Sequence, residues 1–196
     1  MTPELRQARA GKLTASKAAV VMGGLDTEGL KSYVKDIAWE RVYGVPDDEG
    51  FQSEAMRRGQ LVEAEALAWY AFETDSVIDH DPNRTLDHPS VPMVSASPDA
   101  LRFDRVVEVK SPLHRAWMEV ARTGCVPSEY RWQCRWQMWC AGLTACDFVA
   151  YHPKAGGLIV SFPIDDASIL AMVERVPIIE TKIAEWIEIL TMRKAA

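Results

Sequence analysis

The chain has 196 residues, which suits one domain, and its 48% hydrophobic and 26% charged residues are the balance of a globular protein. The net charge of −6 disfavours a simple nucleic-acid coat protein, although residues 1–24 carry four basic residues against one acidic residue and can form a local basic entrance. No stretch is apolar enough to span a bilayer, and the start of the chain lacks the apolar centre of a signal peptide. We therefore expect a cytoplasmic protein with its four cysteines reduced, and its four scattered histidines disfavour a zinc site.

The first half of the chain is predicted to form three helices. Apolar residues recur there at the 3.6-residue spacing of a helix, and glycines stand where the first two helices should end. The first helix should take Thr14 or Ser16 as its N-cap, because a hydroxyl at that position accepts a free backbone N–H. The helices are expected over residues 14–23, 27–44 and 53–74, with a solvated acidic loop over 45–50.

The second half mixes strands and helices, so the whole chain, residues 1–196, is predicted to be a single α/β or α+β domain with a central mixed sheet flanked by helices. A stripe of Trp132, Trp136 and Trp139 fits the buried face of a helix better than a base-stacking platform. Trp186 is expected in the core or at a subunit interface, and Pro177 can kink the last helix. The expected elements are three strands in 76–112, a helix over 129–143, a hairpin over 146–164 with its turn at 153–157, and a helix over 165–194.

The stretch "SASPDALRFDRVVEVKSP" places two carboxylates and a lysine on or beside strands. In its last strand Val107 and Val109 point to one face, whereas Glu108 and Lys110 point to the other, about 7 Å apart. If that strand lies beside the one near Asp99, the three charged groups converge. Two close carboxylates repel each other, Mg²⁺ or Mn²⁺ removes that repulsion, and a lysine can position the attacking water. This is the minimum set for metal-assisted phosphodiester hydrolysis, and the plainer alternative is a Pro-Asp turn beside a solvated edge strand.

Four segments, in the same order, resemble the lambda-exonuclease or YqaJ-type viral recombinase family of PD-(D/E)xK nucleases. They are the stretch just quoted, "RAGKLTAS", "GQLVEAEALAWY" with its G-x-x-x-E-x-x-A pattern, and "EYRWQCRWQMWCAGLTACDFVAYHP" with its glutamine-bearing helix. The resemblance covers most of the chain and implies a restriction-endonuclease-like core. Two residues depart from the family pattern. Ala100 stands where a glycine is usual, so that turn must avoid a positive φ, and Leu5 replaces a tryptophan.

The resemblance implies a role for each charged residue of the motif. Asp99 and Glu108 are the implied metal ligands, with the backbone carbonyl of Val109 as a third oxygen. Lys110 is the implied activator of the water nucleophile.

Two helices are implied to add further polar groups to this site. Glu63 matches the family's helix glutamate, which completes the carboxylate cluster and the metal ligands. Glu65 is the other candidate, but the two point about 200° apart on a helix, and the spacing from Gly59 selects Glu63. Gln133 matches a glutamine that projects toward the catalytic strand, and the alternative is an exposed Gln133 paired with Gln137.

In the family, a basic and hydroxyl pocket holds the 5′-phosphate of a DNA end. Arg9, Ser16 and Ser97 fall on the matching positions, and Arg115 fits a second arginine with a one-residue slip. A guanidinium can hold a phosphate through two hydrogen bonds, and a helix N-terminus adds its dipole. The alternatives are a surface arginine, an N-cap serine and a turn serine.

The resemblance implies a 5′-to-3′ exonuclease that acts on ends of double-stranded DNA and leaves 3′ overhangs for phage-type recombination. It further implies Mg²⁺ as cofactor with Mn²⁺ as a possible substitute, a ring-shaped homotrimer, a single-strand annealing protein as partner, and the cytoplasm of a bacterial or phage-infected cell. One competing hypothesis is an endonuclease of the same fold, which needs no 5′-phosphate pocket. The other is a catalytically idle DNA-end-binding module, against which the intact charged motif argues.

Overall fold

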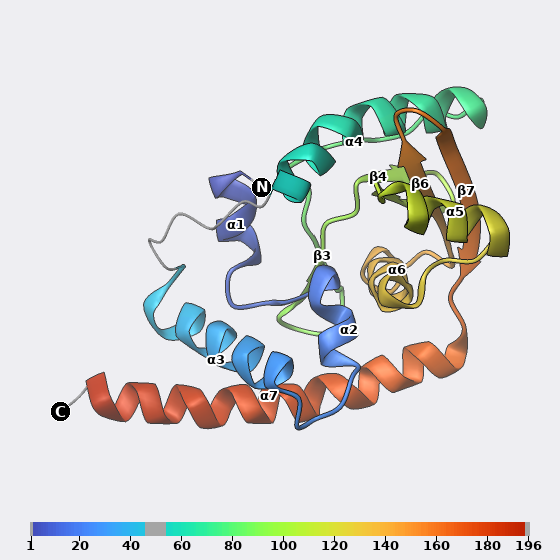
Figure 1. Ribbon diagram of the computed structural model, residues 1–196. Helices are drawn as coiled ribbons and strands as arrows, with labels where there is room; N and C mark the ends of the chain where they lie inside the picture. The colour runs from blue at the N-terminus through green and yellow to red at the C-terminus, as the bar shows by residue number, and fades with distance from the viewer. Residues whose placement is uncertain (1, 46–53, 195–196) are drawn as a thin grey trace.

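The structure is a computed structural model that describes residues 2–45 and 54–194 and shows a mixed α/β architecture (Figure 1). The helices are α1 (Pro3–Arg9), the 3₁₀ turn η1 (Ala15–Lys17), α2 (Ala18–Val21), α3 (Glu28–Tyr43), α4 (Glu54–Glu73), α5 (His114–Thr123), α6 (Ser128–Ala141) and α7 (Asp166–Lys194). The strands are β1 (Leu13–Thr14), β2 (Leu86–Asp87), β3 (Val94–Ala96), β4 (Ala100–Arg102), β5 (Arg105–Lys110), β6 (Ala145–His152) and β7 (Gly156–Pro163).

The larger sheet has the order β4-β5-β6-β7 and is mixed, as predicted. Strands β5 and β6 run parallel, whereas β4 and β7 pair antiparallel with their neighbours. A parallel pair needs a crossover, and α5 with α6 supplies it. A second, smaller sheet of order β1-β3-β2 lies apart from the first.

Helix α6 is shared by two hydrophobic cores. On one side Cys134 and Met138 pack with Phe148 against the larger sheet. On another side Trp136 and Trp139 pack with α2, α3, β3 and α7. The tryptophan stripe therefore belongs to the core, as predicted, and α6 fixes the larger sheet relative to the α3–α7 layer (Figure 1).

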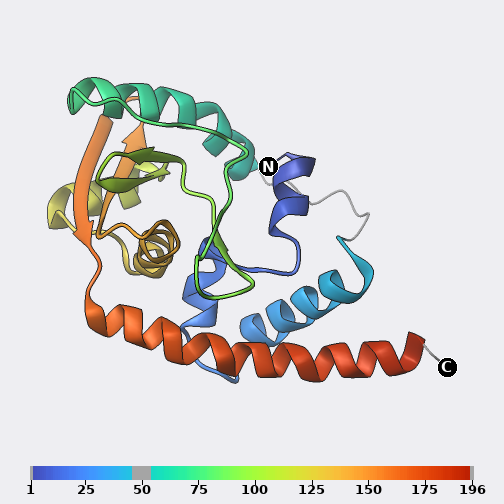
Figure 2. The ribbon, with the colours of Figure 1, turned by 180° about the vertical axis from the view of Figure 1, so that it is seen from behind.

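Helix α4 covers the opposite face of the larger sheet, and Figure 2 shows it from behind. A Cβ atom at Gly157 of β7 would lie 2.1 Å from the ring of Trp69, so only glycine allows this approach. The Tyr70 hydroxyl donates to Asp147 of β6 at 2.6 Å, which adds a buried polar contact. These contacts fix the rotation of α4 about its axis.

Several local expectations were wrong. The helix expected from residue 14 begins as η1 and becomes α-helical at Ala18, and neither hydroxyl acts as a side-chain cap. Both hydroxyls have other partners: the Thr14 hydroxyl lies 3.4 Å from that of Ser16 and 3.5 Å from that of Tyr33, and the Ser16 hydroxyl accepts from Arg9. The hairpin turn is shorter than expected, with β7 starting at Gly156. The expected last helix is present as α7 and includes Pro177, where a kink stays a prediction.

Helices α1 and α5 were not expected, and three strands were expected where β2, β3, β4 and β5 lie. Helix α1 is short, so its periodicity carries little signal, but Thr2 caps it through a hydrogen bond from the Leu5 N–H. Most of the predicted acidic loop, residues 46–50, lies outside the described residues. Among the described helices, none is both long and apolar enough to cross a membrane.

Candidate active site

Asp99 is held against strand β5 by its own carboxylate. It precedes β4, and its Oδ2 accepts the Val109 N–H at 2.7 Å. The pairing of β4 with β5 ends where Ala100 lies opposite Val107. The Val109 N–H lies beyond this last pair and is therefore available to Asp99. The N–H and C=O of one strand residue point to the same edge, so the Val109 carbonyl also faces the Asp99 side.

The strand beside β5 is therefore β4, which follows Asp99, and not β3, which precedes it and belongs to the smaller sheet. Ala100 begins β4 without a positive φ, since the described non-glycine residues with positive φ are Asp75 and Met93. The structure thus brings Asp99 to Glu108 and Lys110 by a different strand pairing from the one expected.

Glu108 is buried and bonded on both carboxylate oxygens. Lys110 forms an ion pair with Oε1, as expected for neighbours on one strand face. The Gln133 amide donates to Oε1 and the Gln137 amide to Oε2, both from α6. Gln133 thus points toward strand β5, as predicted, whereas Gln137 was considered only as a partner of Gln133. The signal for Gln137 was its i+4 position, which places it on the same helix face as Gln133.

The charges of this cluster are unbalanced. Burial, and then the charge of Glu108, raises the pKa of Asp99 well above its usual range. Burial lowers the pKa of Lys110, but the charges of Glu108 and Asp99 outweigh that effect, so the pKa is raised overall. Lys110 is therefore a permanent cation beside two carboxylates.

Glu63 and Glu65 face different surroundings on α4. Burial raises the pKa of Glu63, which also senses the charges of His80, Glu108 and Lys110. Glu65 instead accepts the Tyr151 hydroxyl at 2.8 Å. Glu63 is therefore within electrostatic reach of the cluster, whereas Glu65 attaches α4 to β6.

His80 is a neighbour of the cluster that the sequence analysis missed. Its Nδ1 lies 2.7 Å from the backbone oxygen of Asp99. A carbonyl can only accept, so Nδ1 carries the hydrogen. The bridge between Asp79 and Leu101 brings His80 beside β4, and no local sequence pattern announces that pairing.

Arg9 and Ser16, two of the four predicted phosphate-binding residues, are in contact. Arg9 Nη2 donates to Ser16 Oγ at 2.8 Å. Burial lowers the pKa of Arg9, against the charges of Tyr33, Glu108 and Glu40. This pair therefore lies within electrostatic reach of the candidate catalytic glutamate.

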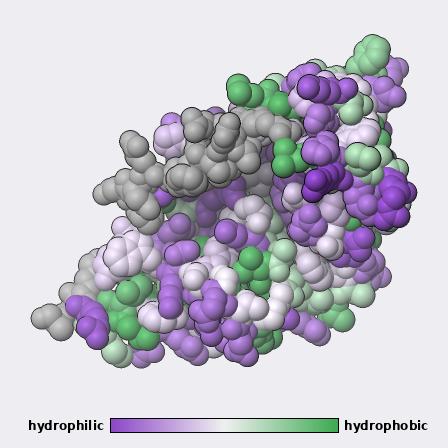
Figure 3. Space-filling model, in the orientation of Figure 1, coloured by the Kyte–Doolittle hydropathy of each residue, from purple (hydrophilic) through white to green (hydrophobic). Residues whose placement is uncertain are grey.

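The other two predicted phosphate-binding residues are placed less directly. The Ser97 hydroxyl lies 3.5 Å from that of Thr85 and two residues before Asp99. Arg115 is exposed on the first turn of α5. Its side chain has no hydrogen bond or ion pair to another described residue. In Figure 1, α1, β3, β4 and α6 lie between α4 and the α3–α7 layer, and Figure 3 shows hydrophilic and hydrophobic residues mixed in the middle of this face.

The donor set fits a hard divalent cation in its chemistry. The carboxylates of Asp99 and Glu108 and the carbonyl of Val109 are oxygen donors, the type that Mg²⁺ and Mn²⁺ prefer. Burial, and then the charge of Glu108, raises the pKa of Asp99, and a cation bound there would offset both effects. No group of three or more His, Cys, Asp or Glu side chains within residues 2–45 and 54–194 is arranged as a metal site. The described oxygen donors that best resemble a metal site are therefore the carboxylates of Asp99 and Glu108 and the carbonyl of Val109. Glu63 is not part of this group.

The mixed α/β fold is that of known exonucleases, and residues 4–144 match the model of the YqaJ-like viral recombinase domain. The chain belongs to this family, which confirms the resemblance found in the sequence.

Two solved proteins resemble the chain over nearly its whole length. The alkaline exonuclease LHK-Exo of Laribacter hongkongensis is 30% identical, with a TM-score of 0.89 over 99% of this chain and 98% of that chain. Its complex with dAMP gives the same TM-score at 31% identity, with the same coverage of both chains. A phage-related exonuclease from Haemophilus somnus 129PT shares the fold at 12% identity, with a TM-score of 0.68 over 93% of this chain and 96% of that chain. No curated protein sequence matched the chain.

Proposed function

We propose that the chain is a Mg²⁺-dependent exonuclease that digests double-stranded DNA from a 5′ end and leaves 3′ overhangs for phage-type recombination. The family, and the likeness to the alkaline exonuclease, identify the broader class: a DNA exonuclease, which is a hydrolase. The observation that carries the proposed chemistry is the hydrogen bond from the Val109 N–H to Asp99, which aligns Asp99 with Glu108 and Lys110.

The metal-binding residues in this proposal are Asp99, Glu108, the Val109 carbonyl and Glu63, and Mn²⁺ can replace Mg²⁺. Mg²⁺ held there would supply Lewis-acid stabilisation of the phosphoryl oxygens and acidify a bound water, in the manner of a two-metal site. Lys110 holds its positive charge beside Glu108, where it can orient the attacking water and stabilise developing negative charge.

The glutamines of α6 act on the orientation of Glu108. Gln133 and Gln137 donate to different oxygens of this carboxylate and so limit its rotation. An amide donor is neutral, so the orientation is fixed without neutralising the charge that a cation needs. Preorganisation of this kind reduces the rearrangement required when substrate binds.

The end-recognition part of the proposal rests on Arg9 and Ser16, with Ser97 and Arg115 as further candidates. The Arg9 guanidinium and the Ser16 hydroxyl already contact each other and can donate to one phosphate. We also propose a homotrimer and a single-strand annealing protein as partner, both of which the family resemblance supports. We further propose a cytoplasmic location, which agrees with the four free thiols.

A direct test compares a linear duplex carrying one labelled 5′ end with a closed circle of the same sequence. With Mg²⁺ the protein should release nucleotides from the 5′ end of the linear duplex, whereas EDTA should stop the reaction. The closed circle should remain intact. Cleavage of the circle at a comparable rate would instead identify an endonuclease.

The phosphate pocket has its own test in Arg9→Ala. Charge-assisted hydrogen bonds are worth roughly 1.5–3 kcal/mol, or about one to two powers of ten in binding or rate. The variant should therefore slow digestion of 5′-phosphorylated duplex by that factor and reduce its preference over 5′-hydroxyl duplex. An equal loss on both substrates would assign Arg9 to general backbone attraction, with a stronger dependence on salt.

A further inference from the structure

The loop between Arg9 and Ser16 is attached to α3 at two places: Tyr33 contacts the Lys12 oxygen and the Thr14 N–H, and a second set of contacts holds Gly11. The Gly11 N–H donates to Glu40 Oε2 at 2.7 Å, and Arg41 Nε donates to the Gly11 oxygen, also at 2.7 Å. Glu40 and Arg41 are consecutive residues of α3, so one helix turn holds both polar groups of this buried glycine.

The close approach depends on glycine at position 11. Gly11 has a φ of +70°, which other residues rarely adopt, and a Cβ atom there would lie 2.8 Å from Arg41 Cγ. The loop therefore has little freedom to shift along α3 while these contacts last.

Arg41 carries the attachment further, to α7. Its Nη1 and Nη2 donate to the two carboxylate oxygens of Glu180 at 2.6 and 2.8 Å. The Arg41 side chain is only 16% exposed and that of Glu180 30% exposed, so the fork geometry is protected from water. Such two-bond pairs fix orientation as well as distance.

We propose that Glu40, Arg41 and Glu180 are positioning residues for the 5′-phosphate pocket. The "Gly11 clamp", as we name these three side chains with Gly11, holds the loop so that Arg9 and Ser16 present their donors together. The clamp lies two residues after Arg9 and five before Ser16, and the charge of Glu40 also reaches Arg9. This inference rests on the proposed end recognition, and it assigns α3 and α7 a part in substrate preference.

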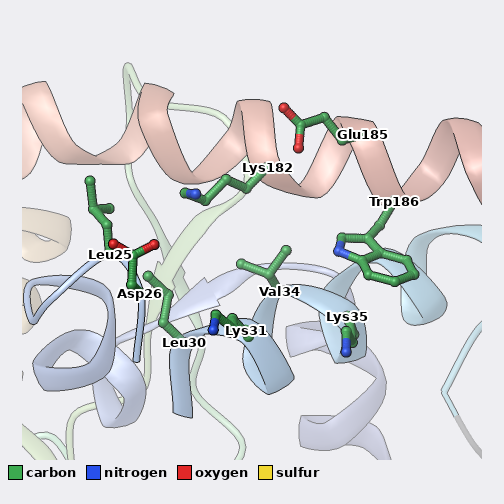
Figure 4. Close-up of a pocket in the computed structure, with 9 residues that line it drawn as sticks. All are labelled: Leu25, Asp26, Leu30, Lys31, Val34, Lys35, Lys182, Glu185 and Trp186. Carbon is green, nitrogen blue, oxygen red and sulfur yellow. The ribbon is translucent and has the colours of Figure 1, made fainter. Parts of the chain in front are cut away.

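The test uses Glu180→Gln, which keeps the side-chain shape but removes the charge that orients Arg41. Its matched control is Glu185→Gln on the same helix. Glu185 is exposed and lines a hollow of about 280 Å³ between α3 and α7, whose lining includes neither Gly11 nor Arg41 (Figure 4). The quantity measured is the ratio of the digestion rate on 5′-phosphorylated duplex to that on 5′-hydroxyl duplex.

The Glu180→Gln variant should reduce this ratio by roughly three- to tenfold, mainly through KM for the phosphorylated end, since a misplaced contact loses part of its effect. Glu185→Gln should leave the ratio at its original value. Arg41→Lys, which keeps the charge but cannot form the fork, should reproduce the loss. Hydrogen exchange at the amides of residues 10–14 should quicken in Glu180→Gln and not in the control.

The outcomes separate this inference from the function on which it rests. A wild-type protein without any preference for a 5′-phosphate would overturn the pocket and the clamp together. A wild-type preference that survives unchanged in both Glu180→Gln and Arg41→Lys would overturn the clamp alone. Equal rate losses on both substrates, with a lower Tm, would show that Glu180 serves stability only.

Discussion

The larger sheet contains two buried carboxylate clusters with different charge balance. At one end, Asp147 of β6 accepts hydrogen bonds from Tyr70 at 2.6 Å, Arg105 at 3.0 Å and Ser161 at 2.7 Å. Burial and the contact with Asp147 raise the pKa of Tyr70 to about 12, so the phenol stays a donor. Arg102 also lies 4.0 Å from Asp147, and both arginines pair with Asp104, so two carboxylates here are matched by two arginines.

The other cluster has more negative than positive charge. Asp99 and Glu108 share Lys110 as their near cation, and the remaining donors to Glu108 are the neutral amides of Gln133 and Gln137. A buried carboxylate that lacks full compensation is costly unless it is protonated or binds a cation. The comparison separates a cluster that holds the fold from one that is suited to bind a metal.

The most direct test of whether the two clusters differ in role is to remove one carboxylate from each. Asp99→Ala should abolish Mg²⁺-dependent cleavage, by at least about 10³-fold, because a lost metal ligand removes several kcal/mol of charge stabilisation. Lys110→Ala should also abolish cleavage while it spares metal binding. Digestion of labelled duplex and calorimetric titration with Mn²⁺ measure the two effects, and substantial cleavage by Asp99→Ala would refute the site.

Asp147→Ala should show the opposite pattern. It removes the acceptor of the buried Tyr70 hydroxyl, while Arg105 keeps its pair with Asp104, so the free energy of unfolding should fall by about 1–3 kcal/mol. Urea denaturation measures that loss, and cleavage per folded molecule should match the wild-type value. A stable Asp147→Ala protein with impaired cleavage would show that the clusters are not separate in role.

The sequence was informative where the pattern is local. Alternation along β5 predicted that Glu108 and Lys110 share one face, because a strand has a period of two. The helix spacing from Gly59 predicted that Glu63, and not Glu65, turns toward the cluster, and the Tyr151 contact of Glu65 agrees. Asp99 followed from the Pro-Asp motif and the family resemblance.

Contacts between distant segments were beyond the same reasoning. His80 contacts the backbone oxygen of Asp99, 19 positions away in the sequence, because the bridge between Asp79 and Leu101 brings the two segments together. Arg41 pairs with Glu180, which is 139 positions away. Neither pair has a periodicity or a motif that links its members. The second sheet was missed for a related reason. Its strand β1 is only two residues long, and it pairs with a distant part of the chain, where Leu13 lies opposite Val94.

A finer comparison is between the two glutamates of α4. Glu63→Gln should lower cleavage by roughly 10²-fold, because it removes a charge near the proposed metal site. Glu65→Gln should change cleavage less than about twofold, since the amide oxygen can still accept the Tyr151 hydroxyl. Initial rates on one 5′-phosphorylated duplex measure both, and the reverse ranking would mean that α4 presents its other side to the substrate.

The smallest expected effect concerns the charge imbalance itself. The pKa of Asp99 is raised in the folded protein, so its contribution to stability is complete below the unfolded pKa and is lost as the pH rises through the folded pKa. In EDTA, Asp99→Asn should therefore melt a few degrees above wild type at pH 8, at about 2–4 °C per kcal/mol, and the difference should shrink toward pH 5. Asparagine can still accept the Val109 N–H, so the backbone contact is kept.

Millimolar Mg²⁺ should reverse that ranking at pH 8, because the wild-type carboxylate gains a cation that the amide binds poorly. Thermal melts of both proteins at the two pH values, with EDTA and with Mg²⁺, measure the effect. If the melting temperatures of the two proteins changed in parallel with pH in EDTA and did not reverse in Mg²⁺, the Asp99 carboxylate would not be the group that destabilises the protein at high pH. In that case the pairing of Glu108 with Lys110 would already balance the cluster, and the contrast with Asp147 would lose its meaning.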